Sequence, residues 1–232
     1  MAIAEFKDLC IDTAGGETLA RFWASALGLS FEPDERGDRV AGRLTGPTSQ
    51  HTVWMNAVPE DKTVKHRVHL DVHTDSVDTL VGLGATVAEE LEGWTVMTDP
   101  EGGELCAFLR DTLPDYRLYE VVVDCASPGS VARWWSDVFG APLHSHPEHD
   151  EWWLEPVPGA PFDCMVFGSV PEPKTVKNRI HWDVVCSNVQ SLLDHGAQML
   201  RPEADDLGWH VLADPEGNEF CAFTAEPGGP PP

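Results

Sequence analysis

An internal repeat constrains what this chain of 232 residues can fold into more than any other feature of its sequence. Three separate blocks recur in the same order at nearly one spacing, 112 positions for two of them and 115 for the third. Such a recurrence indicates two tandem copies of one domain. The blocks and their second copies are Phe22–Gly28 with Trp134–Gly140, Lys62–Val72 with Lys174–Val184, and Asp99–Phe108 with Asp214–Phe223.

Each copy is itself built from two similar halves. An apolar run at 6–11 is typical of a strand, and apolar residues three and four positions apart over 17–26 are typical of a helix with one buried face. Short strands follow, and the same order begins again after a turn at 59–62. Each copy therefore predicts two βαβββ modules, which gives four modules and an α+β fold class. The other expected strands are 30–32, 39–44, 52–58, 68–72, 87–91, 94–98 and 104–109, with a second helix at 77–83.

The predicted boundaries are 1–110 for copy one, 116–226 for copy two and a disordered Pro/Gly tail at 227–232.

The net charge of −24 opposes binding to nucleic acid or to an anionic membrane. No run approaches the roughly 20 apolar residues of a membrane span, and the first residues do not resemble a signal peptide. The six cysteines fit reduced thiols, so we expect an acidic cytoplasmic protein.

Together these motifs resemble the vicinal oxygen chelate superfamily, which contains glyoxalase I, extradiol dioxygenases and bleomycin-binding proteins. The likeness is strongest to its glyoxalase-like branch and covers residues 5–225. It rests on the Phe-Trp helix at 22–23, the Arg-x-His-Leu-Asp strand at 67–71 and the Asp-Pro-Glu-Gly hairpin at 99–102. The resemblance implies that the four modules pair within the chain into two open-barrel domains, each around a pocket.

The resemblance also implies candidate metal ligands. Metal-dependent relatives carry ligands on the first, fifth and eighth strands of a domain, and the eighth is usually a glutamate. Here that position is a cysteine in both copies, and a thiolate favours zinc or iron over a hard ion such as magnesium. Three protein ligands with an open fourth position are common in catalytic zinc sites. The matching residues are Asp8, His69 and Cys106 in copy one, and Glu120, His181 and Cys221 in copy two.

A site without metal is the other interpretation of the same residues, and it is our first expectation. A buried cysteine behaves as a small apolar residue, and loss of the carboxylate is typical of metal-free binders in this superfamily. His69 and His181 lie two positions before Asp71 and Asp183, so each pair shares one face of its strand and can hydrogen-bond. A divalent ion (Zn, Fe, Mn or Ni) is the alternative.

Tryptophan is unusually frequent, with nine tryptophans against two tyrosines. Several lie on strands that would surround the pockets, where indole rings can stack on a planar or cationic ligand. The predicted ligand-binding residues are Trp54 and Trp94 at the first pocket, and Trp182 and Trp209 at the second.

Three functional hypotheses follow, and the sequence leaves open whether the protein is an enzyme. Under each of them we expect a monomer or a homodimer. The first is a small-molecule-binding protein, for antibiotic resistance or sequestration of a planar ligand. The second is a metal-dependent lyase, isomerase or dioxygenase of the glyoxalase type. The third is a metal-free lyase or isomerase in which His69 or His181 works with the neighbouring aspartate.

Overall fold

The computed structural model describes residues 2–34 and 40–225, and the predicted tail at 227–232 lies outside these residues. Every helix and strand predicted for copy one is present, with ends that differ by a few residues, and the α+β class is confirmed. Copy one consists of β1 (Ala4–Thr13), α1 (Glu17–Leu27), β2 (Ser30–Pro33), β3 (Val40–Thr45), a 3₁₀ turn (Ser49–His51), β4 (Val53–Ala57), β5 (Val68–Thr74), α2 (Val77–Gly82), β6 (Thr86–Glu90), β7 (Thr95–Thr98) and β8 (Glu104–Leu109).

Copy two repeats this order of elements. Each long helix ends at a glycine in the left-handed region, Gly28 with φ 73° after α1 and Gly140 with φ 62° after α3, where a side chain would be strained. The elements of copy two are β9 (Leu118–Cys125), α3 (Pro128–Phe139), β10 (Leu143–Ser145), β11 (Glu151–Leu154), β12 (Cys164–Ser169), β13 (Ile180–Cys186), α4 (Val189–Asp194), β14 (Gln198–Arg201), β15 (His210–Ala213) and β16 (Glu219–Thr224).

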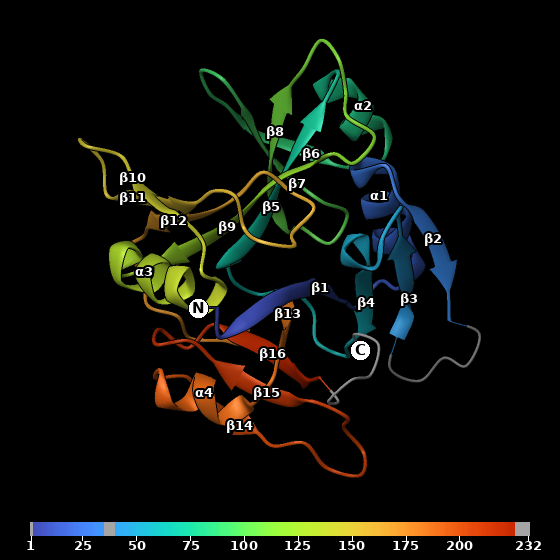
Figure 1. Ribbon diagram of the computed structural model, residues 1–232. Coiled ribbons are helices and arrows are strands. Elements are labelled where there is room, and N and C mark those ends of the chain that lie inside the picture. Colours follow the sequence, from blue (N-terminus) through green and yellow to red (C-terminus); the bar gives the residue numbers. More distant parts are fainter. Residues whose placement is uncertain (1, 35–39, 226–232) are drawn as a thin grey trace.

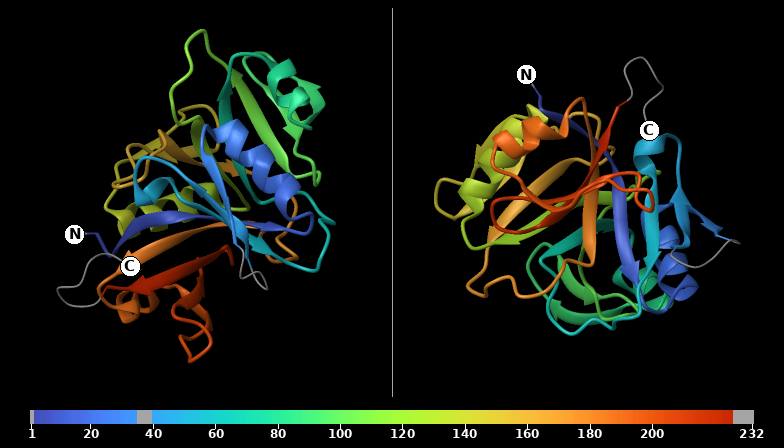
Figure 2. Two further views of the ribbon diagram at one scale, coloured as in Figure 1. Left: turned by 90° about the vertical axis from the view of Figure 1, so that its right-hand side faces the viewer. Right: turned by 90° about the horizontal axis from the view of Figure 1, so that it is seen from below.

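The four modules combine into two open sheets of eight strands each, and each sheet takes one module from each copy (Figure 1). Sheet A has the order β14-β15-β16-β13-β1-β4-β3-β2, and sheet B has the order β10-β11-β12-β9-β5-β8-β7-β6. The first module therefore pairs with the fourth, and the second with the third. Both views of Figure 2 show the blue β1 beside the orange β13, although they lie at opposite ends of the sequence. The repeat alone did not specify this exchange between copies.

The two sheets are joined in the same way at their centres. In sheet A, β1 pairs antiparallel with β13, and in sheet B, β5 pairs antiparallel with β9. Each junction contains an irregularity at the same place in the repeat, at Lys7 in β1 and at Tyr119 in β9. A bulge interrupts the strict alternation of side chains along a strand. Lys7 can therefore lie beside Asp8, and Tyr119 beside Glu120.

A single apolar core fills the space between the sheets and the long helices. Helix α1 packs on β2 and β3, and α3 packs on β11, β12 and β1. Trp135 of α3 meets Trp182 of β13 with ring centroids 4.8 Å apart, and both side chains are fully buried. Because strand side chains alternate, the opposite face of each sheet carries the neighbouring polar residues. We call this the polar face; in sheet A it bears Asp8, Cys10 and His181.

Candidate functional site

Two equivalent groups of His, Cys and carboxylate side chains lie on the polar faces, one at the centre of each sheet. The sheet-B cluster consists of His69 and Asp71 from β5, Cys106 from β8 and Glu120 from β9. Ligand atoms of the first three all lie within 4.8 Å of one another. Glu120 stands directly opposite Asp71 in the β5–β9 pairing. The cluster therefore draws its residues from both copies.

The contacts within the sheet-B cluster are short and specific. His69 Nε2 lies 3.4 Å from Asp71 Oδ1, which also accepts a hydrogen bond of 3.2 Å from the backbone N–H of Cys106. The thiol of Cys164, on β12, donates to Glu120 Oε2 at 3.2 Å. The second ring nitrogen of His69, Nδ1, is buried and has no hydrogen-bond partner among the described residues.

Burial dominates the electrostatics of this cluster. It lowers the pKa of His69 to about 4, so the imidazole is neutral at physiological pH. Burial, together with the neighbouring Glu120 carboxylate, raises the pKa of Asp71 well above its usual value. Burial also raises the pKa of Glu120, and burial and Asp71 raise the pKa of the Cys106 thiol. Two carboxyl groups that face each other without a cation share a proton, and a bound cation would release it.

The sheet-A cluster consists of Asp8 and Cys10 from β1, His181 and Asp183 from β13, and Cys221 from β16. Its distances resemble those of sheet B: His181 Nε2 lies 3.7 Å from Asp183 Oδ1 and 3.6 Å from Cys221 Sγ. Cys10 Sγ lies 3.7 Å from Asp183 Oδ1. Burial lowers the pKa of His181 to about 4, and burial and Asp8 raise the pKa of Asp183 well above its usual value.

The two clusters differ in their neighbours. In sheet A, the ammonium group of Lys7 lies 2.7 Å from Asp8 Oδ2, and the indole N–H of Trp54 donates to the same oxygen at 3.1 Å. The repeat replaces these residues by Tyr119 and Val166 in sheet B. The sheet-A carboxylates thus have a positive charge beside them and a large ring over them. Among the described residues, no lysine or arginine pairs with the sheet-B carboxylates, and no indole donates to them.

The crossed pairing corrects one expectation. Asp8 was grouped with His69, and Glu120 with His181, because each pair belongs to one copy of the repeat. In the structure Asp8 stands opposite Asp183, next to His181, and Glu120 stands opposite Asp71, next to His69. The reason is that β1 is a neighbour of β13 and not of β5. The residue types were identified from the sequence, but their partners depend on non-local strand order.

The four tryptophans predicted to bind ligand have different surroundings. Trp94 is 39% exposed and stacks on Phe108 at 6.1 Å. Trp209 stacks on Phe223 at 5.4 Å, and Trp54 contacts Asp8 as described above. Trp182 is fully buried in the core. It does not line a pocket, because His181 and Asp183 on either side of it point to the polar face and alternation sends Trp182 to the other.

Two cysteines near the clusters were not predicted as site residues. Cys10 belongs to the sheet-A cluster, and Cys164 contacts Glu120 in sheet B. Neither has a cysteine at the equivalent position of the other copy, so the repeat did not mark them. The alternation of Asp8, Cys10 and Asp12 along one strand was a usable signal, because residues two apart share a face.

Comparison with known families agrees with this fold. The family model for the glyoxalase-like domain matches residues 8–108 and again residues 120–223. The chain belongs to the glyoxalase-like domain family. It is a tandem glyoxalase-like protein of the vicinal oxygen chelate superfamily, as the motifs suggested.

Solved structures of low sequence identity resemble this glyoxalase-like chain over nearly its whole length. Glyoxalase I from Zea mays superimposes with a TM-score of 0.68 at 11% identity, covering 95% of this chain and 92% of that one. The cppA protein from Streptococcus pneumoniae TIGR4 gives a TM-score of 0.53 at 9% identity, covering 96% and 100%. At these identities the likeness concerns the fold. No curated protein sequence matches, and no helix among the described residues is long and apolar enough to span a membrane.

Proposed function

We propose that the sheet-B cluster holds one divalent metal ion and that the protein is a metal-dependent enzyme of the glyoxalase type acting on a small molecule. The observation that carries this proposal is the difference between the clusters. Asp8 in sheet A has Lys7 as a counter-charge, whereas no lysine or arginine of the described residues forms an ion pair with Asp71 or Glu120. A buried pair of carboxyl groups beside a neutral imidazole is stabilised by a cation, and this donor set can hold one.

The donor set fits such an ion. His69 supplies a neutral imidazole, Asp71 and Glu120 supply carboxylates, and Cys106 supplies a thiol within the same 4.8 Å group as His69 and Asp71. This mixture of nitrogen, oxygen and sulfur suits zinc or iron. When bound, the metal would polarise two neighbouring oxygens of the substrate as a Lewis acid. We infer that sheet A, closed by Lys7 and Trp54, has a structural role.

The residues around the sheet-B cluster support a role for aromatic contacts in substrate binding. Tyr119, next to Glu120, packs on His73 at 4.6 Å and on Phe108 at 5.0 Å. Phe108 in turn stacks on the partly exposed Trp94. Such rings can hold the flat part of a substrate against the sheet. Burial raises the pKa of Glu120, which is the direction that makes its carboxylate a better proton acceptor.

The first test is elemental analysis of the purified protein with His69→Ala and His181→Ala as matched variants. Each variant removes one buried imidazole from equivalent strands. We expect about one zinc, iron, manganese or nickel per chain in the unaltered protein and in His181→Ala, and loss of the metal in His69→Ala. Metal that survives in His69→Ala and disappears in His181→Ala would show that the sheets have been assigned the wrong way round. Protein that stays empty after incubation with divalent ions would exclude the metal-dependent function.

A second candidate function is metal-free binding of a planar small molecule. The exposed Trp94 favours it, together with Phe108, which stacks on Trp94, and Tyr119, which meets Phe108 edge-on. This hypothesis predicts that chelator-treated protein still shows quenching of tryptophan fluorescence by a planar ligand, and that Trp94→Ala loses most of the signal. Quenching that needs the metal would leave only the enzyme hypothesis.

A further inference from the structure

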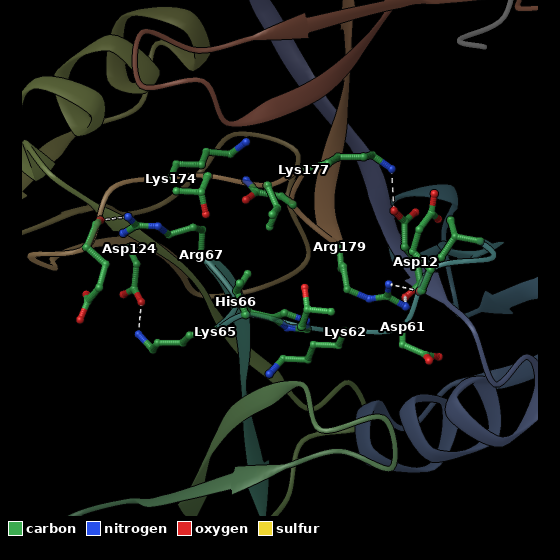
Figure 3. A pocket seen from close by; sticks show the side chains of 18 of the residues that line it. Asp12, Asp61, Lys62, Lys65, His66, Arg67, Asp124, Lys174, Lys177 and Arg179 are labelled. Carbon is green, nitrogen blue, oxygen red and sulfur yellow. Dashed lines mark hydrogen bonds and ion pairs between the residues drawn. The ribbon is translucent and has the colours of Figure 1, made fainter.

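A cavity of about 970 Å³ lies between two loops that connect the sheets, and no residue of either cluster lines it (Figure 3). We call residues 58–67 and 170–179 the crossover loops. The first runs from β4 in sheet A to β5 in sheet B, and the second runs from β12 in sheet B to β13 in sheet A. They are equivalent segments of the repeat, so the cavity has two similar halves. Its volume is within the range of pockets that hold small organic molecules.

The cavity gathers positive side chains in a protein of net charge −24. The chain has only five lysines, and all except Lys7 line this cavity, together with Arg67 and Arg179. The other lysines are Lys62, Lys65, Lys174 and Lys177. Five acidic residues also line it, so the lining carries a formal charge of +1, against −24 for the whole chain. They are Asp12, Glu60, Asp61, Asp124 and Glu172. The cavity is therefore less repulsive to an anion than the protein as a whole.

These lysines fall into two kinds. Lys62 and Lys174 are mostly buried and form ion pairs of 2.9 Å and 2.8 Å with Glu104 and Glu219, which anchor the loops to the strands. Lys65 and Lys177 have side chains 56% and 57% exposed. Each of these two pairs with one aspartate of the other copy, Lys65 with Asp124 and Lys177 with Asp12.

An ammonium group has three N–H donors, and the aspartate occupies one of them. Lys65 and Lys177 therefore keep donors for a ligand without breaking the existing ion pairs. Figure 3 shows the two ammonium groups on opposite sides of the cavity, as the repeat requires. Val64 and Val176 also line the cavity, with 41% and 45% of their surface exposed. Exposed valines in a concave wall favour an apolar occupant.

We propose that the cavity between the crossover loops is a second ligand site, which binds an organic anion with an apolar body and an acidic group at each end. The apolar body lies on Val64 and Val176, and the acidic groups reach Lys65 and Lys177. This site is separate from the proposed metal site. It uses none of the residues of the sheet-B cluster.

The test uses two fluorescent probes with similar rings and different charge. The first is the disulfonate 4,4′-dianilino-1,1′-binaphthyl-5,5′-disulfonate, and the second is the uncharged N-phenyl-1-naphthylamine. We expect the disulfonate to bind the full-length protein at one site, more weakly as salt rises. Lys65→Gln/Lys177→Gln should weaken its affinity about tenfold or more. The matched control, Arg21→Gln/Arg201→Gln, removes the same charge from exposed ion pairs elsewhere and should leave the affinity within about twofold.

A second variant is needed because Lys65→Gln/Lys177→Gln removes two ion pairs and can lose binding through misfolding alone. Val64→Asp/Val176→Asp adds negative charge to the wall and leaves every ion pair intact, so it should abolish disulfonate binding. His69→Ala should bind the disulfonate normally, which separates this site from the metal site. The proposal fails if Val64→Asp/Val176→Asp binds the disulfonate as the unaltered protein does. It also fails if the uncharged probe binds as tightly as the disulfonate, or if His69→Ala alone abolishes binding.

Discussion

Lys7 and Tyr119 occupy equivalent positions in the two sheets and give their surroundings opposite character. Lys7 lies over Phe223, 4.4 Å from its ring centroid, and pairs with Asp8. Tyr119 packs on Phe108, the equivalent of Phe223, and adds no charge beside Glu120. One residue therefore distinguishes a cluster that has an ammonium group beside its carboxylate from a cluster that has none among the described residues.

Tyr119→Lys should therefore weaken metal binding in sheet B. An ammonium group beside Glu120 would take the place of the metal ion as counter-charge. We expect the metal affinity to fall by roughly tenfold or more, about 1.4 kcal/mol, in competition with a chromogenic chelator. Tyr119→Phe keeps the ring without the charge and should retain the metal. Equal metal content in the two variants would contradict the role given to Lys7.

His66 predicts a pH dependence of stability. Burial lowers its pKa to about 4 against 6.5 in an unfolded chain, and Glu104, Lys62, Arg179 and His69 are the charged or titratable groups around it. Between these values the unfolded state binds a proton that the native state does not, so stability is lost as the pH falls from 6.5 towards 4. His66→Asn should reduce the loss of unfolding free energy between pH 7 and pH 5 by about 1 to 2 kcal/mol. Urea denaturation at the two pH values measures it, and an unchanged difference would show that His66 titrates normally.

At the residue scale, the sequence located the candidate side chains better than it located their contacts. His69, His181, Asp8, Glu120 and the two predicted cysteines all lie at the centres of the sheets. The sequence analysis assigned Trp182 to a ligand pocket, but its side chain is buried in the core. Alternation along its strand, with His181 and Asp183 on the polar face, predicts this burial. The partners of Asp8 and Glu120 could not be predicted, because strand neighbours come from distant parts of the chain.

The hairpin before β8 and its equivalent before β16 show how one element varies between the copies. In both, an aspartate at the first turn position accepts backbone hydrogen bonds, Asp99 from Gly103 and Asp214 from Asn218. In copy two, Asn178 donates to Asn218 at 3.0 Å, and Asn218 donates to Asp214 at 2.9 Å. In copy one, His66 and Gly103 replace the two asparagines, and both ring nitrogens of His66 lack hydrogen-bond partners among the described residues.

His66→Asn and Gly103→Asn should therefore be strongly coupled. A β-carbon on Gly103 would lie 2.6 Å from Asp99 Oδ2 and 2.7 Å from His66 Cε1, so Gly103→Asn alone is overpacked and should cost about 1–3 kcal/mol. The double variant can form the Asn–Asn contact of copy two. We expect a coupling energy of about 1–3 kcal/mol in a double-mutant cycle measured by urea denaturation. Additive effects would show that copy one does not accommodate the copy-two arrangement.

At the element scale the sequence was a good guide. Apolar periodicity and glycine positions located the helices and strands, because both signals are local. The bulges at Lys7 and Tyr119 were not predicted, since they arise from the register between β1 and β13 and between β5 and β9.

For the whole molecule, the exchange of modules makes each copy depend on the other. Copy one alone would leave β1 without β13 and β5 without β9, and these are central strands whose open edges invite pairing. The repeat predicted two copies from sequence alone. It could not predict whether modules pair within or between copies, because both arrangements use the same local elements.

Separately produced fragments 1–112 and 113–232 should therefore associate. We expect a mixture to form a 1:1 complex with the elution volume of the intact chain. Each fragment alone should be unfolded or should pair with a second copy of itself. Size-exclusion chromatography with light scattering distinguishes these states. A folded monomeric fragment 1–112 would contradict the dependence of each copy on the other.

The arrangement of β1, β13 and β16 has a consequence for chain order. Ala4 at the start of β1 and Thr224 at the end of β16 both pair with Cys186, so they lie about 10 Å apart, two strand spacings. A short linker can connect these two ends of the chain, and new termini can be created between copy one and copy two. Such a circular permutant would encode copy two before copy one and keep every strand neighbour. The strand neighbours of the four modules therefore do not depend on which copy comes first in the chain.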